Sequence, residues 1–402
     1  MKYRFLLVCL LLVQAFRLGA HPVDSVRISL LTCAPGNYIY TLFGHTAIRY
    51  EDPARNRDWV FNYGLFSFRA PNFIWRFVKG ETDYMLGVEL YRNFDDEYRQ
   101  RGSAVFQQEL RLTAREKQNL IRKLQWNSLE ENRVYRYNFL YDNCTTRALA
   151  CIESSLNGTV QFRSSFSTLS FRDIIHQYTI GHEWAQFGMD FCLGSPADER
   201  ISWREELFAP FYLLAAVDSA VVMREGMDNV PLACPAAELI PSAGIDRSEH
   251  YWLTPLEAGW LLFLGGVFLT VIGVWKSRRF WIIDGILALV AGLAGVVIAF
   301  LAFVSVHPAV SPNYLLCAFH PFYLLYLPYL IYVELKGKKD WMQLVNGVFL
   351  TLFMILLPVL PQKINPAVLP LVGVLWVRAV GYTYLYYKGM RNTICVGRKL
   401  ES

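Results

Sequence analysis

Several motifs that would identify a common enzyme class are missing from this 402-residue sequence. It has no His-Glu-x-x-His and no closely spaced cysteine pairs, so no zinc signature is present. It also lacks the Gly-x-Ser-x-Gly element of serine hydrolases and a glycine-rich phosphate loop. Coiled-coil heptads and internal repeats do not stand out. We therefore expect neither a metal nor another cofactor.

The chain also has only a small formal net charge of +5. Most of this excess comes from short basic segments in the last third of the chain: Lys276, Arg278, Arg279, Lys336, Lys338, Lys339, Lys388, Arg391, Arg398 and Lys399. Such loops are typical of membrane anchoring. The charge therefore gives no case for a nucleic-acid partner.

The N-terminus has the layout of a secretory signal peptide over residues 1–20. Lys2 and Arg4 precede an apolar run from Phe5 to Phe16, and small residues lead to Ala20. An uncleaved anchor is the alternative, but the run is short for a bilayer span. We expect cleavage after Ala20.

Five apolar stretches follow residue 255, and each is close to the roughly 20 residues that a spanning helix needs. They are Glu257–Trp275, Phe280–Val304, Tyr314–Val333, Trp341–Leu360 and Val368–Tyr387. We expect a membrane domain of five helices over residues 255–402, preceded by a linker over residues 243–254.

The basic loops predict the orientation of these spans. Between the basic segments lie Ser305–Asn313 and Pro361–Pro366, which carry only Lys363. The positive-inside rule then makes the C-terminus cytoplasmic. Because the number of spans is odd, residues 21–242 are expected on the exported side, as the signal peptide also indicates.

The exported part reads as an α+β domain, with strands first and helices later. Strands are predicted at Val26–Leu31, Tyr38–Phe43, His45–Tyr50, Asp58–Tyr63, Tyr84–Tyr91 and Ala104–Leu112. A capping box at Thr113–Glu116 opens one helix toward Trp126, and a second helix runs from Cys144 to about Leu156. Helix-like runs at Phe171–Tyr178 and Leu207–Val222 follow in a segment that we expect to wrap the same domain.

Cys144 and His45 are the candidate nucleophile and base. A helix N-terminus favours the thiolate form of a cysteine, and a histidine on a strand can take its proton. The exported part has five cysteines, so at least one thiol stays unpaired, and Cys151 lies too far along the same helix for a disulfide with Cys144. Cys192 and Cys234 are a possible pair. Two alternatives are that Cys144 has a structural role and that His182, instead of His45, is the base.

A third group should orient the imidazole. Asn62 and Tyr63 are candidates on the next strand, and only one can face His45 because neighbouring side chains alternate; we favour Asn62. Arg49 and Arg147 could meet a phosphate or form plain salt bridges.

Polar residues in the membrane region form a second set of candidates. Asp284 and Arg378 fall inside apolar spans and could pair with each other. His307 and Asn313 lie in a loop on the exported side, where they could contact a lipid headgroup or a lipoprotein terminus. Helix capping is the alternative for this loop.

Two segments resemble the signature of the Lnb-type exported domain. They are Tyr40–Tyr50, which contains Gly44-His45, and Tyr137–Arg147, which contains Asp142-Asn143-Cys144. The intervening Val60–Gly64 also fits, and the five-span tail resembles the usual companion of this domain. The resemblance implies a circularly permuted papain-like fold of the NlpC type, in which histidine precedes cysteine.

The resemblance also implies an activity, that of a bacterial lipoprotein N-acyltransferase in the inner membrane. Its catalytic domain would face the periplasm. It would move an acyl chain from a membrane phospholipid, through a thioester on Cys144, to the α-amino group of a diacylated lipoprotein. His45 would act as base, with Asn62 as third member. Independently of the resemblance, we expect Tyr63, Arg49 and Arg147 among the substrate-binding residues. The alternatives are a papain-like peptidase or amidase acting on the cell wall, and a non-catalytic membrane-anchored assembly module.

Overall fold

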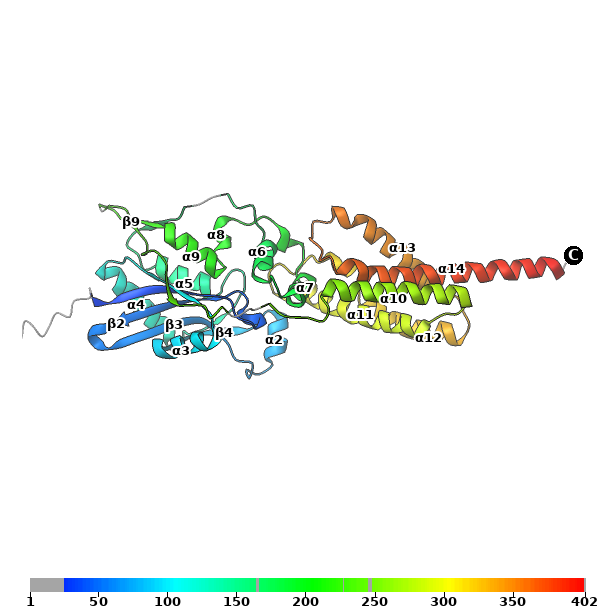
Figure 1. Cartoon of the computed structure of the whole chain (residues 1–402), viewed down its shortest axis with the longest axis horizontal. Helices are drawn as coiled ribbons and strands as arrows, with labels where there is room; N and C mark the ends of the chain where they lie inside the picture. Colours follow the sequence, from blue (N-terminus) through cyan, green and yellow to red (C-terminus); the bar gives the residue numbers. More distant parts are fainter. Residues whose placement is uncertain (1–24, 164–165, 227, 245–247, 401–402) are drawn as a thin grey trace, which may run out of the picture. The chain divides into compact units, whose positions relative to one another are not determined.

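The structure is a computed structural model that describes residues 25–163, 166–226, 228–244 and 248–400. The predicted signal peptide and part of the predicted linker lie outside these residues. The chain forms two compact units (Figure 1). The first contains the residues up to Phe73 together with Thr82–Ser167 and Ser202–Asp246; the second contains Ile74–Glu81, Thr168–Ile201 and the residues from Arg247 onward.

The first unit is built on a seven-stranded sheet in the order β10-β5-β1-β2-β3-β4-β6, with every neighbouring pair antiparallel. Its strands are β1 (Arg27–Cys33), β2 (His45–Asp52), β3 (Arg57–Leu65), β4 (Asp83–Leu90), β5 (Val105–Glu109), β6 (Val134–Arg136) and β10 (Ala237–Ile240). A smaller sheet joins β7 (Thr159–Gln161), β8 (Val221–Met223) and β9 (Val230–Pro231).

Alternating strand residues feed two cores, one on each face of the large sheet. Ile48 and Phe61 pack on one face with apolar residues of α4 (Ala114–Ser128), α5 (Cys144–Glu153) and α9 (Pro210–Ser219). Their neighbours Ala47 and Val60 pack on the other face with Phe94 of α3 (Tyr91–Arg101). A short helix, α8 (Trp203–Glu206), also belongs to this unit. The predicted α+β class is confirmed.

One predicted strand is wrong. Tyr38–Phe43 contains a 3-10 turn, η2 (Ile39–Thr41), because Thr41 Oγ1 donates to Tyr38 O at 2.8 Å and closes the chain locally. Its aromatic residues suggested a strand by composition, but Tyr38, Ile39 and Tyr40 are exposed. The predicted capping box is present, since Thr113 N donates to Glu116 Oε2 at 2.8 Å and Glu116 N to Thr113 Oγ1 at 3.3 Å.

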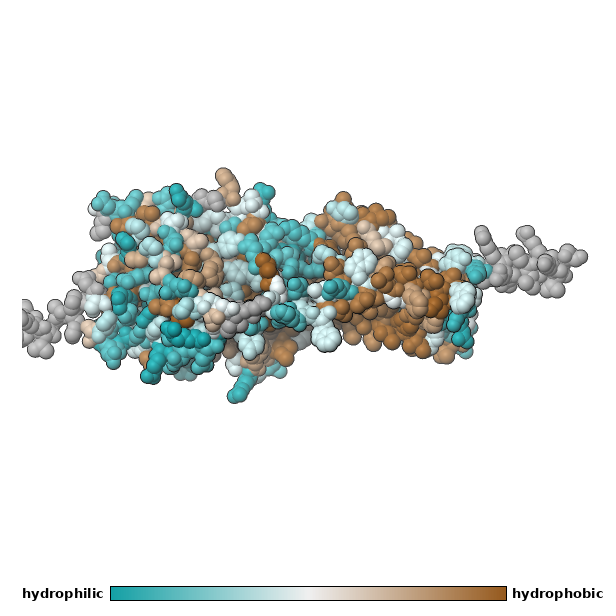
Figure 2. Space-filling view, viewed as in Figure 1, coloured by the Kyte–Doolittle hydropathy of each residue, from teal (hydrophilic) through white to brown (hydrophobic). Residues whose placement is uncertain are grey.

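The second unit contains five apolar helices long enough to cross a membrane. They cover Pro255–Lys276, Trp281–Phe303, Tyr314–Leu335, Trp341–Val359 and Val368–Lys388, and correspond to α10 (Pro255–Lys276), α11 (Trp281–Phe303), η5 (Tyr314–Cys317) with α12 (Phe322–Leu335), α13 (Trp341–Leu356) with η6 (Leu357–Val359), and α14 (Val368–Leu400). The five predicted spans agree with these bounds. Hydrophobic residues cover the visible face of the helices, as expected where lipid is the solvent (Figure 2).

Four shorter elements belong to the same unit. They are α6 (Phe171–Tyr178), α7 (Glu183–Cys192), η4 (Ser195–Asp198) and, except for its first residue, α2 (Phe73–Lys79). Arg172 of α6 is fully buried and donates to Asp190 Oδ1 at 2.6 Å and to Asp198 Oδ1 at 2.9 Å. Asn365 Nδ2 also donates to Asp190, at 2.8 Å. These polar contacts hold α6, α7 and η4 to the loop between α13 and α14.

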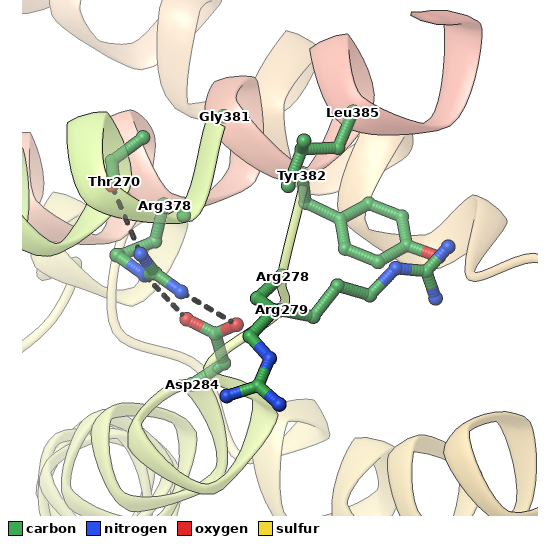
Figure 3. A pocket seen from close by; sticks show the side chains of 9 residues that line it. Thr270, Arg278, Arg279, Asp284, Arg378, Gly381, Tyr382 and Leu385 are labelled. Atoms are coloured by element: carbon green, nitrogen blue, oxygen red, sulfur yellow. Dashed lines mark hydrogen bonds and ion pairs between the residues drawn. The ribbon is translucent and has the colours of Figure 1, made fainter. Parts of the chain in front are cut away.

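The two charged residues predicted inside the spans do pair with each other (Figure 3). Arg378 donates from Nε to Asp284 Oδ1 at 2.7 Å and from Nη2 to Asp284 Oδ2 at 3.1 Å. Its remaining amino group donates to Thr270 Oγ1 at 3.0 Å. All three nitrogen atoms of the guanidinium thus have a partner, which makes a buried charge tolerable in an apolar bundle.

Candidate active site

His45 is placed by the glycine that precedes it. Gly44 has φ = +73°, and a Cβ atom there would lie 2.4 Å from the backbone oxygen of Cys33. Only glycine fits this close left-handed turn. The turn leads directly into β2, where His45 is the first residue and pairs with Cys33 of β1.

Cys144 is placed by the cap of α5. Asn143 Oδ1 accepts from Thr145 N at 2.8 Å and from Thr146 N at 3.0 Å, while Thr146 Oγ1 accepts from Asn143 N at 2.8 Å. Asn143 is buried and also donates from Nδ2 to Phe139 O and Phe208 O, each at 2.9 Å. Cys144 is therefore held as the first residue of the helix, where unpaired N–H groups favour a negative charge.

The His45 imidazole and the Cys144 thiol are close enough for each to shift the pKa of the other. Burial alone would raise the pKa of the Cys144 thiol, but the charge and hydrogen bond of His45, with further bonds from Thr46 N and Thr145, lower it below its ordinary value. Burial alone would lower the pKa of His45, but the Cys144 thiolate and the bond to Asn62 raise it. Both shifts favour a thiolate–imidazolium pair.

Two neighbouring thiols show the opposite behaviour. Burial raises the pKa of Cys33 to about 12 and that of Cys151 to about 11. Both are free and buried, as Cys144 is. Burial is thus common to the three thiols, and the imidazole distinguishes Cys144. Cys192 and Cys234, a possible pair by sequence, are also free in the structure.

Asn62 is the residue of β3 that reaches the imidazole. Its Oδ1 lies 3.2 Å from Nε2 of His45, and its Nδ2 donates to Glu89 Oε1 of β4 at 2.6 Å. Tyr63 points to the other face of the sheet, where its hydroxyl accepts from Asn127 Nδ2 at 2.8 Å. The alternation of β3 thus brings Asn62, and not Tyr63, to His45.

The two predicted arginines both have carboxylate partners. Arg49 donates to both oxygens of Asp58, at 2.8 and 2.6 Å, and lies over the ring of Tyr91. Arg147 donates to both oxygens of Asp142, at 2.6 and 2.7 Å. Each guanidinium is thus held in a bidentate salt bridge, one of the two readings that the sequence left open.

Three other sequence candidates belong to the second unit. His307 Nε2 lies 2.6 Å from Phe77 O, and Asn313 caps η5 and donates to Phe191 O at 3.0 Å. His182 is buried as the N-cap residue of α7, with Nδ1 3.6 Å from Glu249 Oε1. His307 and Asn313 therefore have hydrogen-bond partners within their own unit, whereas the buried Nδ1 of His182 has none among the described residues, since 3.6 Å is too long for a hydrogen bond.

Several residues around the thiol were not predicted. The hydroxyl groups of Thr145 and Thr46 are hydrogen-bonded at 3.1 Å beside Cys144. Glu89 accepts from Asn62, so a series of contacts, which we call the contact line, runs from Cys144 through His45 and Asn62 to Glu89. Gly64 has φ = +91°, and a Cβ atom there would lie 3.5 Å from Cys144 Cβ and 3.6 Å from Tyr137 Cε2. Thr46, Tyr137 and Thr145 lie within the two segments that resemble the Lnb signature, and Gly64 lies in β3, where a glycine often marks a close approach.

The described residues contain no group of three or more His, Cys, Asp or Glu side chains that could hold a metal ion. The donor set at the site consists of one thiol, one imidazole, one amide and one carboxylate, arranged in a line. In such a series of contacts the imidazole can take the proton from the sulfur, and the resulting thiolate can attack a carbonyl carbon.

Comparison with known proteins adds two matches. The model of the Lnb N-terminal periplasmic domain matches residues 14–178, and that of the Lnb transmembrane domain matches residues 247–389. The first match contains the histidine, asparagine and cysteine of the site, and the second contains the five apolar helices. No curated protein and no solved structure matches the chain.

Proposed function

Because this chain belongs to the Lnb proteins, which combine a periplasmic domain with a transmembrane domain, we propose that it is a lipoprotein N-acyltransferase. The family makes it a lipoprotein-related protein of the inner membrane with a periplasmic N-terminal domain. The observation that carries the proposal is the Cys144–His45 pair, whose thiol has a lowered pKa although it is buried.

The first half-reaction acylates the enzyme. The Cys144 thiolate adds to the carbonyl carbon of a phospholipid ester, the carbon–oxygen bond to the glycerol breaks, and a thioester forms. The His45 imidazolium gives its proton to the departing lysophospholipid oxygen. Since Thr145 N and Thr146 N are bonded to Asn143, the backbone N–H of Cys144 is the donor that the helix end offers to the oxyanion.

The second half-reaction transfers the chain. The α-amino group of a diacylglyceryl-cysteine attacks the thioester carbonyl, an amide bond forms and the carbon–sulfur bond breaks. His45 takes the proton released by the amine, which restores the thiolate–imidazolium pair. No oxidant, metal or nucleotide is required. The five spans anchor the enzyme in the membrane in which both lipid substrates reside. In this arrangement the basic loops and the C-terminus are cytoplasmic.

The two alternatives fit less well. A cell-wall peptidase needs a thiol of the same kind but gains nothing from five apolar spans. A purely structural module has no use for a thiol with a lowered pKa. Burial is the largest effect on the thiols of Cys33 and Cys151, and it raises their pKa instead.

The test uses the full-length protein in detergent with a phospholipid and a synthetic diacylated lipopeptide. Wild-type protein is expected to yield N-acylated lipopeptide and a mass increase of one acyl chain on the Cys144 peptide. Cys144→Ala should yield neither, and Cys144→Ser, which keeps the shape of the side chain, should be strongly impaired. Cys151→Ala is the matched control on the same helix and should retain activity. Undiminished product from Cys144→Ala would refute the proposal.

A further inference from the structure

A continuous line of aromatic rings begins beside the candidate thiol and ends at the surface of the first unit. We define this aromatic row as Tyr137, Tyr84, Phe66, Phe68, Tyr40 and Tyr38. Tyr137 stacks on Tyr84 with centroids 4.0 Å apart, and Tyr84 on Phe66 at 4.9 Å. Phe66 contacts Phe68 at 4.9 Å and Tyr40 at 5.9 Å, and Tyr40 stacks on Tyr38 at 5.6 Å.

The inner end of the aromatic row meets Cys144 over Gly64. A Cβ atom on Gly64 would be 3.5 Å from Cys144 Cβ and 3.6 Å from the Tyr137 ring, so both side chains face the position that a side chain on this glycine would fill. Because Gly64 has no side chain, the backbone leaves room between the thiol and the first ring.

The outer end of the aromatic row is unusually exposed. Tyr38, Tyr40 and Phe68 show 68%, 52% and 65% of their surface to solvent. Tyr38 and Tyr40 lie at η2, which precedes His45 in the chain. Phe68 lies in the loop after β3, the strand that contains Gly64. Exposed rings add little hydrophobic stabilisation to the folded protein, and patches of exposed apolar side chains commonly mark binding surfaces.

We propose that the aromatic row binds the acyl chain whose carbonyl carbon is attached to the Cys144 sulfur. The proposal rests on the function proposed above and names the part of the substrate that these rings recognise. No charged side chain belongs to the aromatic row. A hydrocarbon chain needs no polar partner and gains affinity with each methylene group that leaves water, so contact with successive rings favours long chains over short ones.

The test compares two p-nitrophenyl esters that differ only in chain length, butyrate and palmitate, with full-length protein in detergent. The rate of acylation is followed by p-nitrophenol release and by the mass of the Cys144 peptide. Phe68→Ser combined with Tyr40→Ser is expected to lower the palmitate rate about tenfold while changing the butyrate rate less than about twofold. Phe68→Leu and Tyr40→Phe, which keep apolar surface, should stay near wild type with both esters.

Two further variants keep the test decisive. Tyr38→Ser removes the outermost exposed ring, should leave folding intact, and should reduce the palmitate rate selectively. Trp126→Ser removes an exposed aromatic residue of α4 outside the aromatic row and should change neither rate. Equal loss with both esters, no loss with either, or the same palmitate defect in Trp126→Ser would overturn the inference.

The failure of the proposed function gives a different result. If wild-type protein acquires no acyl group on Cys144 from either ester, the thiol mechanism itself is wrong. If wild-type protein is acylated and chain length does not matter to the variants, the mechanism stands and the aromatic row binds something else, such as a sugar or peptide.

Discussion

Asn62 Oδ1 lies 3.2 Å from His45 Nε2, so the imidazole nitrogen on this side carries the hydrogen in a normal hydrogen bond. The other nitrogen, Nδ1, is then the one available to the Cys144 thiol. Asn62 is itself oriented, since its Nδ2 donates to Glu89 Oε1 at 2.6 Å. The contact line therefore sets both the tautomer and the direction of the ring.

Replacing Asn62 tests this orientation. In Asn62→Ala the ring loses its partner, and we expect acylation of Cys144 to slow by roughly a hundredfold, as small misplacements of a reacting group do. Asn62→Asp keeps an acceptor oxygen and should retain more activity than the alanine variant. The measurement is the rate of p-nitrophenyl butyrate cleavage across pH, together with thermal unfolding. A fully active Asn62→Ala protein would show that this contact does not orient the base.

The opposite pKa shifts of Cys144 and His45 predict the pH dependence of thiol alkylation. A lowered thiol pKa moves the rise of thiolate to lower pH, so Cys144 should react with iodoacetamide below the usual thiol range. In His45→Ala the stabilising cation is gone, and the rise should move to higher pH. Since burial raises the pKa of Cys33 and Cys151, both should stay unmodified at neutral pH.

Peptide mass spectrometry distinguishes the three thiols in this experiment. Unfolding the protein in denaturant is the control, because all thiols should then react alike. Equal alkylation profiles for Cys144 in wild type and His45→Ala would contradict the thiolate–imidazolium pair. On the alkaline side, the raised pKa of His45 predicts that acylation falls only above the ordinary histidine range.

The parts of the site that the sequence predicts are those with local causes. The strand that starts at His45, the helix that starts at Cys144 and the alternation of β3 each depend on residues within a few positions, so their patterns can be read directly. Glu89 was not predicted because its contact with Asn62 depends on the register of β3 and β4, which pairs Val60 with Glu89. No short-range pattern specifies that register.

The fold shows the same division between local and distant causes. The five spans are long apolar runs and were predicted closely, whereas β7, β8 and β9 are two or three residues long and carry no measurable periodicity. Thr168–Ile201 falls in the second unit, and a sequence interpretation that treats residues 21–242 as one domain does not separate it. It is joined to the rest of that unit by contacts between distant residues, since Asn365 Nδ2 donates to Asp190 Oδ2 at 2.8 Å and Asn313 Nδ2 to Phe191 O at 3.0 Å.

Gly64 offers a test of the space beside the thiol. Gly64→Ala adds a methyl group facing Cys144 and Tyr137 on a backbone with φ = +91°. We expect a loss of about 1–2 kcal/mol in the free energy of unfolding from the backbone, and a larger, separate loss of acylation. Gly226→Ala is the matched control, because Gly226 also has positive φ (+70°) but has open space around it. Its variant should lose stability without losing activity; equal activity in both variants would mean that the space over Gly64 is not used.

The buried pair of Arg378 and Asp284 predicts a thermodynamic coupling in the membrane domain. Asp284→Leu leaves the guanidinium in an apolar bundle without its carboxylate, and removing one partner of a buried pair typically costs about 3–5 kcal/mol. The double variant Asp284→Leu with Arg378→Met removes both charges and should be considerably more stable than either single variant. Thermal unfolding of the full-length protein in detergent measures the cycle, with Glu97→Ala, which breaks the exposed pair with Arg101, as a control expected to change little. Strictly additive single-variant losses would show that the two charges do not stabilise each other, and would make the pair a candidate for a role other than holding α11 to α14.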